Sequence, residues 1–315
     1  MKILRNLLNK FSKKKIDTRT FSQFGGMWLD ILDSSKKNAK LSEIRITNAE
    51  MADKLSYFDE HGYVILRNAI PHELCDNICE VLDNAYQYGN ETINAQFPDE
   101  QGVKRAIKAG DSYKSARIID TYMVMPEILT ALFNEKIKEF LTVAFEEEPL
   151  LFQSLNFIEG SGQRLHQDTA FVVTSEPMKL IASWIALEDI QQGSGELNFV
   201  PGSHRYKEYL FSGKYKHFNP ERDGQRALQY FYDHLEKEIK KKNGQVSNFL
   251  AKKGDVLLWH ADLYHGGSPV ELDGVTRKSL VGHYCPLSAE PNFFNFANKN
   301  IHLKDGNKFA SSYYD

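Results

Sequence analysis

Cysteine, excess charge of one sign and long apolar runs are all scarce in this chain of 315 residues, and each scarcity excludes a class of protein. The three cysteines, Cys75, Cys79 and Cys285, are too few and too scattered for a disulfide framework or a cysteine-based zinc site. Their scarcity favours a reducing, cytoplasmic compartment. No apolar run is long enough to cross a bilayer. The 39 basic and 42 acidic residues nearly balance, so the chain lacks the strongly basic character of a dedicated nucleic-acid binder.

The N-terminal fifteen residues depart from this balance, because they carry six positive charges and no negative one. Their apolar residues fall at helical spacing, at Ile3, Leu4, Leu7, Leu8 and Phe11. Such a basic amphipathic helix predicts weak peripheral contact with an anionic membrane surface; packing against the chain's own domain or a partner, or a frayed tail, are the alternatives. Asn6, Asn9 and Lys10 interrupt the apolar stretch that a secretory signal needs. We therefore predict residues 1–45 as a basic amphipathic extension and residues 46–315 as a single domain.

The spacing of apolar residues predicts helices in the first half of the chain and short strands in the second. One helix follows Pro71, another runs from Pro126 through Val143, and a charged helix spans about residues 225–242. Five aromatic and β-branched segments, bounded by glycine, proline or aspartate, are typical of strands: residues 150–160, 180–190, 196–204, 254–267 and 277–286. The 42% hydrophobic and 26% charged residues rule out wholesale disorder. Helices followed by many short strands predict an all-β core with flanking α-helices.

His166 and Asp168 are the first pair with the chemistry of a metal site. They follow a glycine-containing turn at residues 160–162, and alternation along a strand places both side chains on one face, with Gln167 pointing away. One imidazole nitrogen and one carboxylate oxygen can then reach a single metal ion. A lone His-x-Asp is usually accidental, so the pair gains weight only from the motifs that follow it.

Residues 259–267, WHADLYHGG, offer two histidines as a third ligand. His260 and His265 are five residues apart, so in a regular strand they face opposite sides. A turn at Gly266-Gly267 lets the chain reverse into the strand that carries Arg277, which favours His265; His260 follows an apolar run and is predicted to lie in the wall. Two histidines and one carboxylate with open positions opposite them are typical of non-heme Fe(II) oxygenases.

Arg277 and Ser279 begin the next predicted strand and share one of its faces. A guanidinium fork and a hydroxyl group then converge on one anion. This pair predicts a clamp for the far carboxylate of a dicarboxylic cosubstrate whose other end chelates the metal. An arginine paired with an aspartate in the barrel wall is the alternative that would be favoured without the metal triad.

These motifs occur together. The chain from about residue 50 to about residue 290 resembles the phytanoyl-CoA dioxygenase family of Fe(II)/2-oxoglutarate oxygenases. The resemblance rests on HQD (166–168), SWIALEDIQQGSGELNFVPGSH (183–204), GDVLLWHADLYHGG (254–267), RKS (277–279) and, upstream, DEHGYVILRNAIPHELCDNICEVL (59–82). Residues 1–45 and the tail after Pro286 have no counterpart in it. The resemblance implies a double-stranded β-helix, a cupin-like jelly roll, with iron near the mouth of the barrel.

By position, the resemblance implies that His166, Asp168 and His265 are the iron ligands and that Arg277 binds the C5 carboxylate of 2-oxoglutarate. The further cosubstrate contacts that it implies are Gln167, Trp184, Ser279, Asn156 and Arg117. The cofactor would be Fe(II), with 2-oxoglutarate and O2 as cosubstrates. His204, in the PGSH turn, is interpreted as organising its loop rather than as a fourth ligand.

The implied reaction is hydroxylation of an unactivated C–H bond of a small-molecule substrate, with release of succinate and CO2. Related halogenases replace the carboxylate ligand with a small residue, whereas this chain keeps Asp168, which favours hydroxylation or a similar oxidation. A non-catalytic metal-binding or sensing member of the fold stays open as an alternative, and so does a zinc hydrolase, which the Arg277 clamp disfavours. The loops expected to line the substrate, about residues 87–113 and 206–249, favour a polar or anionic substrate. The basic N-terminal helix adds a lipid or glycan precursor as an alternative to a small soluble metabolite.

Overall fold

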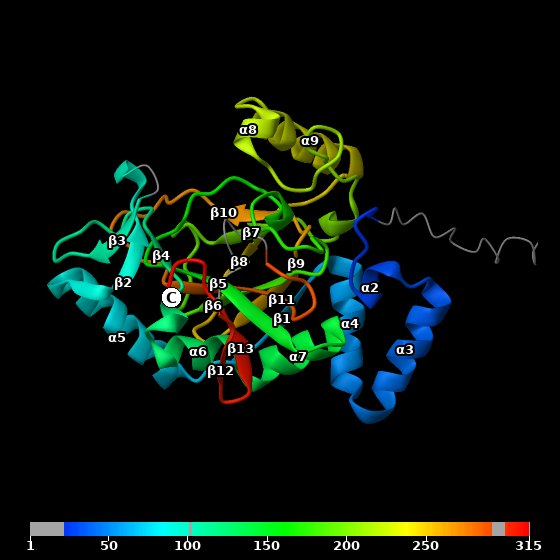
Figure 1. Ribbon diagram of the computed structural model, residues 1–315, viewed down its shortest axis with the longest axis horizontal. Coiled ribbons are helices and arrows are strands. Elements are labelled where there is room, and N and C mark those ends of the chain that lie inside the picture. Colours follow the sequence, from blue (N-terminus) through cyan, green and yellow to red (C-terminus); the bar gives the residue numbers. More distant parts are fainter. Residues whose placement is uncertain (1–21, 101–102, 292–299, 315) are drawn as a thin grey trace, which may run out of the picture.

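Two antiparallel β-sheets lie at the centre of the protein, for which the computed structural model describes residues 22–100, 103–291 and 300–314 (Figure 1). The larger sheet runs, in spatial order, through β1 (Tyr63–Leu66), β9 (Val256–His260), β6 (Ile181–Ala186), β11 (Ser279–Pro286), β5 (Pro149–Phe157), β4 (Arg117–Ile119), β2 (Asn90–Gln96) and β3 (Lys104–Ile107). The smaller sheet runs through β10 (His265–Gly267), β7 (Leu197–Phe199) and β8 (Ser247–Phe249). A hairpin of β12 (His302–Lys304) and β13 (Asn307–Phe309) joins β5, with β13 parallel to it.

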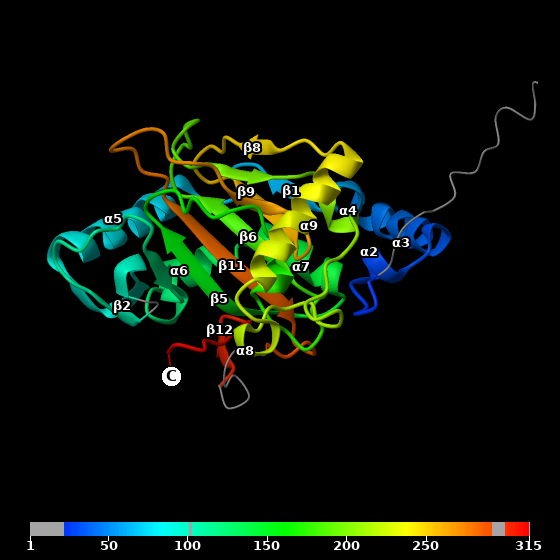
Figure 2. The ribbon, with the colours of Figure 1, turned by 90° about the horizontal axis from the view of Figure 1, so that it is seen from above.

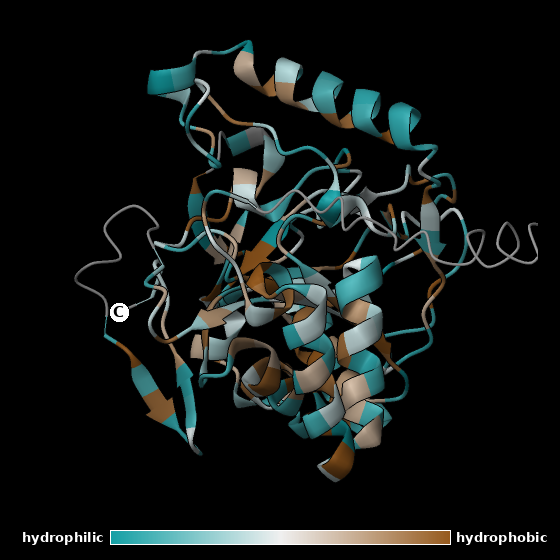
Figure 3. Ribbon diagram, turned by 90° about the vertical axis from the view of Figure 1, so that its right-hand side faces the viewer, coloured by the Kyte–Doolittle hydropathy of each residue, from teal (hydrophilic) through white to brown (hydrophobic). Residues whose placement is uncertain are grey.

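Helices cover the outer face of the larger sheet and extend the molecule at its edges (Figures 1 and 2). They are α2 (Trp28–Ile31), α3 (Ser34–Thr47), α4 (Ala49–His61), α5 (His72–Tyr88), α6 (Pro126–Leu132) and α7 (Glu135–Phe145). Two further helices, α8 (Pro220–Asp223) and α9 (Ala227–Lys242), lie on the side of the smaller sheet (Figure 1). Short 3-10 turns are η1 (Pro98–Glu100), η2 (Thr121–Met123), η3 (Asp168–Ala170) and η4 (Ser203–Arg205). Helix α9 packs through Phe231 into an aromatic cluster of its own, and its outer side is hydrophilic (Figure 3).

Alternation along the central strands separates the two faces of the larger sheet. In β9, Leu258 packs with the helices, whereas Leu257 and Trp259 pack in the space between the two sheets. In β5, Leu151 likewise faces the helices and Phe157 faces the interior. The interior between the sheets is therefore lined by every second residue of the central strands, and the candidate functional site lies there.

The predicted all-β core with flanking helices is confirmed. The two sheets face each other as in a jelly roll, and they do not close into a continuous barrel. Helices cover one face of the larger sheet, and its other face is turned toward the smaller sheet. Its central strands are therefore buried on both faces and read as nearly continuous apolar runs, such as IASWIA in β6 and VLLWH in β9.

The helix predicted from Pro126 through Val143 is in fact two helices, α6 and α7. The break falls at Phe133 and Asn134, where the side chain of Asn134 accepts a hydrogen bond from the backbone N–H of Lys136 at 3.1 Å. An asparagine in this position caps the start of a new helix. The apolar spacing continues across the break, which is why periodicity alone predicted one element.

The predicted extension, residues 1–45, is described from residue 22 onward. Trp28 in α2 is buried, and its indole N–H donates to the carbonyl of Val143 at 3.0 Å. Helix α3 runs across position 45, so the described part of this segment packs on the domain. Residues 1–15, with their predicted membrane contact, lie outside the described residues. In the part of the chain that the structure describes, no helix has the length and apolar character needed to span a membrane.

Candidate metal centre and cosubstrate pocket

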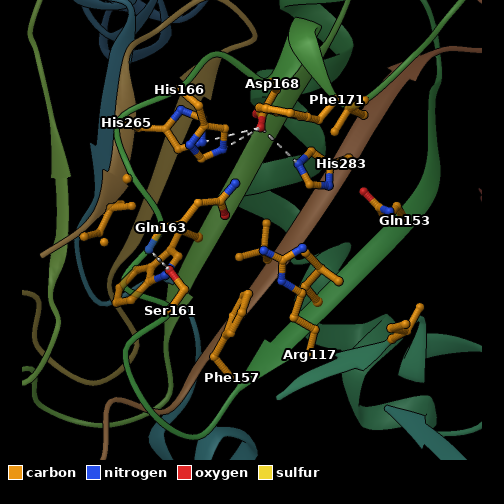
Figure 4. A pocket seen from close by; sticks show the side chains of 18 of the residues that line it. Arg117, Gln153, Phe157, Ser161, Gln163, His166, Asp168, Phe171, His265 and His283 are labelled. Carbon is orange, nitrogen blue, oxygen red and sulfur yellow. Dashed lines mark hydrogen bonds and ion pairs between the residues drawn. The ribbon is translucent and has the colours of Figure 1, made fainter. Parts of the chain in front are cut away.

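His166, Asp168 and His265 meet in the interior between the two sheets (Figure 4). The Nε2 atoms of His166 and His265 lie 3.9 and 3.4 Å from Oδ1 of Asp168. The candidate ligand atoms of the three residues all lie within 4.8 Å of one another, and all three side chains are buried. Two imidazoles and one carboxylate at these separations can hold one metal ion.

A short backbone bridge brings the two histidines together from distant parts of the chain. The backbone N–H of His166 donates to the carbonyl of His265 at 2.8 Å, and the reverse hydrogen bond is 3.0 Å long. A Cβ atom at Gly266 would lie 2.6 Å from the carbonyl oxygen of Gln163, so glycine permits this close approach. The strand predicted through residues 166–168 is reduced to this single bridge at His166, and Asp168 already begins the turn η3. The side chain of Asp168 nevertheless converges with that of His166.

Both candidate histidine ligands have their second ring nitrogen fixed by a backbone carbonyl. Nδ1 of His166 lies 2.9 Å from the carbonyl oxygen of Arg164, and Nδ1 of His265 lies 2.9 Å from that of Leu263. Because a carbonyl oxygen can only accept, each Nδ1 carries a proton, which leaves Nε2 as the nitrogen that can bind a metal ion. Such contacts orient the rings that bind metals in proteins.

His260 and His265 belong to different sheets, β9 and β10, rather than to one regular strand. The chain turns between them, and only His265 joins the cluster. His260 is buried on the other side of β9, where its Nε2 lies 3.4 Å from the carboxylate of Asp30 in α2. Its ring also lies 5.2 Å from that of His204, whose Nε2 contacts the carbonyl of Asp59. His260 is therefore a buried residue of the barrel wall, where it connects β9 to α2.

A third imidazole, His283 in β11, points toward the same carboxylate (Figure 4). Its Nε2 lies 3.7 Å from Oδ1 of Asp168, and its buried Nδ1 has no hydrogen-bond partner. Burial raises the pKa of Asp168, but His265 and His283 outweigh this effect and hold it well below its ordinary value. Burial lowers the pKa of His166 to about 3. Burial also lowers the pKa of His265, but Asp168 outweighs it and the net shift is upward.

These shifts predict that metal affinity rises with pH. Since the pKa of His265 lies above the ordinary value of 6.5, its imidazole holds a proton near neutral pH that a metal ion must displace. Below that pKa, the affinity for Co(II) is expected to fall about tenfold per pH unit; above it, the affinity levels off. His166, already neutral, adds no such dependence. Titrations with Co(II) from about pH 5.5 to 8.5 check this. An affinity independent of pH over that range contradicts it.

The cluster lines a cavity of about 290 Å³ that extends between the sheets. Arg277, Trp184 and Arg117, all expected to contact the cosubstrate, line this cavity together with the three candidate ligands. Gln153 and His283, which are neighbours across the β5–β11 pairing, also face it. The cavity therefore extends from the three candidate metal ligands to two arginines.

Arg277 is buried in this cavity without an acidic partner. Its Nη1 donates to the hydroxyl of Ser279 at 3.0 Å, and its Nε is buried without a hydrogen-bond partner. The rings of Trp184 and Phe157 flank the guanidinium, with centroids 5.5 and 5.6 Å away. Burial lowers the pKa of Arg277 to about 10. Among the described residues no carboxylate forms an ion pair with it, so its charge is available to an anionic ligand.

Three residues expected to contact the cosubstrate do not line the cavity. The side-chain amide of Gln167 donates to the carbonyl of Asp262 at 3.1 Å. Asn156 lies on the helix-facing side of β5, where its oxygen accepts a hydrogen bond from Thr121 at 2.6 Å; the residues of this strand that line the cavity are Gln153, Leu155 and Phe157. Ser279 acts through Arg277, whose guanidinium it holds.

Sequence reasoning missed His283, Gln153, Gln163 and Tyr313, which all line the cavity. Alternation from Arg277 along β11 would have found His283, since both positions share a face. Tyr313 comes from the C-terminal tail, for which no local pattern predicts a place. Of the two loops expected to line the substrate, residues 87–113 contribute Gln96, whereas no described residue of 206–249 lines the cavity. The latter segment forms the aromatic cluster under α9 instead.

Comparison with known proteins identifies the family. The phytanoyl-CoA dioxygenase family model matches residues 58–278, well over half of the chain. The chain belongs to the phytanoyl-CoA dioxygenase family. As a member, it is an enzyme of the 2-oxoglutarate-dependent dioxygenase class, whose cofactor is iron and whose cosubstrate is 2-oxoglutarate.

Individual members of this family are distant from the chain in sequence. The 1-deoxypentalenic acid 11-beta-hydroxylase of Streptomyces exfoliatus is 23% identical over 227 residues, which cover 68% of this chain and 72% of the relative. Peroxisomal phytanoyl-CoA dioxygenase of Bos taurus is 20% identical over 261 residues, covering 76% and 70%.

Solved structures share the fold at similarly low identity. The epimerase SnoN from nogalamycin biosynthesis, in complex with Fe3+, alpha ketoglutarate and nogalamycin RO, is 15% identical, with a TM-score of 0.58 over 84% of this chain and 98% of SnoN. EctD from S. alaskensis, with 2-oxoglutarate and 5-hydroxyectoine, is 16% identical, with a TM-score of 0.54 over 75% of this chain and 76% of EctD.

Proposed function

We propose that this dioxygenase hydroxylates an unactivated C–H bond of a small polar metabolite or of the end of a lipid or glycan precursor. In this proposal His166, Asp168 and His265 bind Fe(II), and Arg277 binds the far carboxylate of 2-oxoglutarate. The strongest support is the buried guanidinium of Arg277, which lies in the same cavity as the cluster and has no acidic partner among the described residues. Glu188 and Glu196 act on this charge only from a distance and do not offset its burial, so the site is suited to an anionic ligand.

The donor set fits ferrous iron. The Nε2 atoms of two imidazoles converge on Oδ1 of Asp168, and a mixed imidazole–carboxylate set suits iron better than a thiolate set would. Bound iron, together with 2-oxoglutarate and O2, supplies the oxidising power for attack on a C–H bond. The chain's own residues orient the reactants: Arg277 fixes one end of the cosubstrate, and Trp184 and Phe157 shield that charge from water.

The remaining polar lining supports a small polar substrate. Gln153 and His283 face the cavity side by side and can hydrogen-bond a substrate. Arg117 also lines the cavity without an acidic partner among the described residues and stays a proposed cosubstrate contact, with its side chain exposed to solvent. Because 2-oxoglutarate takes part of the roughly 290 Å³, the space left suits a small molecule or one end of a longer one.

Incubation with Fe(II), ascorbate, 2-oxoglutarate and a metabolite extract, with succinate as the readout, tests the proposal. We expect succinate to form only with O2 present and to disappear on addition of a chelator or on replacement of iron by Zn(II). Oxygen-independent hydrolysis with Zn(II) would instead favour a zinc hydrolase. Tight binding of metal and 2-oxoglutarate without any succinate would favour a non-catalytic sensing protein.

The two histidines of residues 254–267 provide a matched pair of variants. We expect His265→Gln to lower Co(II) affinity by more than about a hundredfold, because it removes a proposed ligand. His260→Gln is expected to leave Co(II) affinity within about threefold of the wild-type value, since His260 faces Asp30 and lies outside the cluster. Loss of Co(II) in His260→Gln but not in His265→Gln would contradict the assignment.

A further inference from the structure

The two oxygens of the Asp168 carboxylate have different partners. Oδ1 faces the Nε2 atoms of His265, His283 and His166, at 3.4, 3.7 and 3.9 Å. Oδ2 accepts a hydrogen bond of 2.7 Å from the indole N–H of Trp259. Both residues of this hydrogen bond are almost fully buried, with Trp259 2% and Asp168 4% exposed. The indole therefore occupies the oxygen that points away from the imidazoles.

Trp259 is held firmly enough to fix the direction of that hydrogen bond. It lies in β9, a strand that is paired on both sides, and its register partners are Tyr63 in β1 and Ala182 in β6. Its ring packs in the apolar cluster between the sheets, and its centroid lies 4.7 Å from that of His265. Turning the indole away would require this cluster to repack, which close-packed interiors resist.

From this geometry we infer that Trp259 is a positioning residue that presents Asp168 to the metal through Oδ1 alone. The inference rests on the proposed metal site. A carboxylate with both oxygens free can rotate or can bind a cation through both of them. With Oδ2 engaged by a neutral N–H donor in a dry interior, only Oδ1 is offered, and the second oxygen does not compete for the positions that the cosubstrate and O2 need.

Co(II) alone is a suitable probe, because its visible absorption reports the coordination of the metal. Trp259→Phe keeps an aromatic ring beside His265 and removes the N–H. We expect it to lower Co(II) affinity by about tenfold to a hundredfold and to change the visible spectrum of the complex, as loss of an outer partner of a metal ligand typically does. Trp28→Phe is the matched control, since it removes a buried indole N–H that serves the carbonyl of Val143, far from the cavity. It is expected to keep both affinity and spectrum.

An isosteric replacement covers the case in which Trp259→Phe fails to fold. The chain has three tryptophans, so Trp259 is the remaining one in a Trp28→Phe/Trp184→Phe background. Growth with benzothienylalanine then replaces its N–H by sulfur and keeps the shape of the ring. Weaker Co(II) binding than in the same background with tryptophan supports the inference. Equal affinity and an equal spectrum overturn it.

Asp168→Ala in the same titration separates this inference from the proposed function. If Asp168→Ala binds Co(II) as the wild type does, the metal site itself is assigned wrongly. If Asp168→Ala loses Co(II) while the protein without the Trp259 N–H binds it normally, the metal site stands and the positioning role of Trp259 is refuted.

Discussion

Asp168→Ala is expected to abolish succinate formation while the protein remains folded. The substitution removes the one carboxylate of the cluster, on which the Nε2 atoms of both candidate histidine ligands converge. Metal affinity should fall by more than about a hundredfold, because even the loss of an outer partner of a ligand costs ten- to a hundredfold. Succinate production and Co(II) titration measure the two effects.

The effect of Asp168→Ala on stability should be small by comparison. The variant leaves the indole N–H of Trp259 without its acceptor, which costs about 1–3 kcal/mol. It also removes the attraction of the carboxylate to His265 and His283, a loss that is partly offset because the burial of the carboxylate is unfavourable in itself. Asp168→Asn is the matched control, since it keeps an oxygen for Trp259 and nearly the same volume but lacks the charge. We expect Asp168→Asn to melt close to the wild type and to be inactive. Full activity in either variant contradicts the assignment of Asp168 as a ligand.

Local patterns predicted the elements of this fold well, because the strands follow simple alternation. Segments 150–160, 180–190 and 277–286 contain β5, β6 and β11, and the positions of Arg277 and Trp184 in the cavity follow from them. The resemblance placed Asn156 among the cosubstrate contacts, but the residues of β5 that line the cavity are Gln153, Leu155 and Phe157. Register relative to the interior needs a reference residue, and the motif resemblance did not supply one for this strand.

The convergence of the candidate ligands was beyond local patterns. His166 and Asp168 do not share a strand; they meet because a bridge to His265 fixes one residue and the turn η3 fixes the other. Such a bridge depends on contacts between distant segments, and only the family resemblance pointed to it. Neither the local patterns nor the resemblance pointed to Tyr313, which reaches the cavity from a tail that the family motifs do not cover.

Arg277→Met is expected to raise the dissociation constant for 2-oxoglutarate by at least about a hundredfold, with Co(II) affinity unchanged. The loss of one side of a buried charge-assisted contact costs on the order of 2–5 kcal/mol. Anaerobic titration of 2-oxoglutarate against the charge-transfer absorbance of the Fe(II) complex measures the change. Arg277→Lys keeps the charge but loses the fork, so an intermediate affinity is expected.

Stability distinguishes a binding role of Arg277 from a structural one, because the two roles predict opposite signs. An arginine that holds the wall together loses stabilising contacts when it is replaced. The Nε atom of Arg277 is instead buried without a partner, and among the described residues no acid lies within ion-pair distance of the guanidinium. Its buried charge therefore lowers the stability of the ligand-free protein. Arg277→Met should therefore melt at the same temperature as the wild type or higher while it binds 2-oxoglutarate poorly. Arg117→Met is the comparison. If Arg117→Met no longer binds 2-oxoglutarate while Arg277→Met still does, the far carboxylate is bound on the β4 side of the cavity. The clamp is then assigned to the wrong arginine.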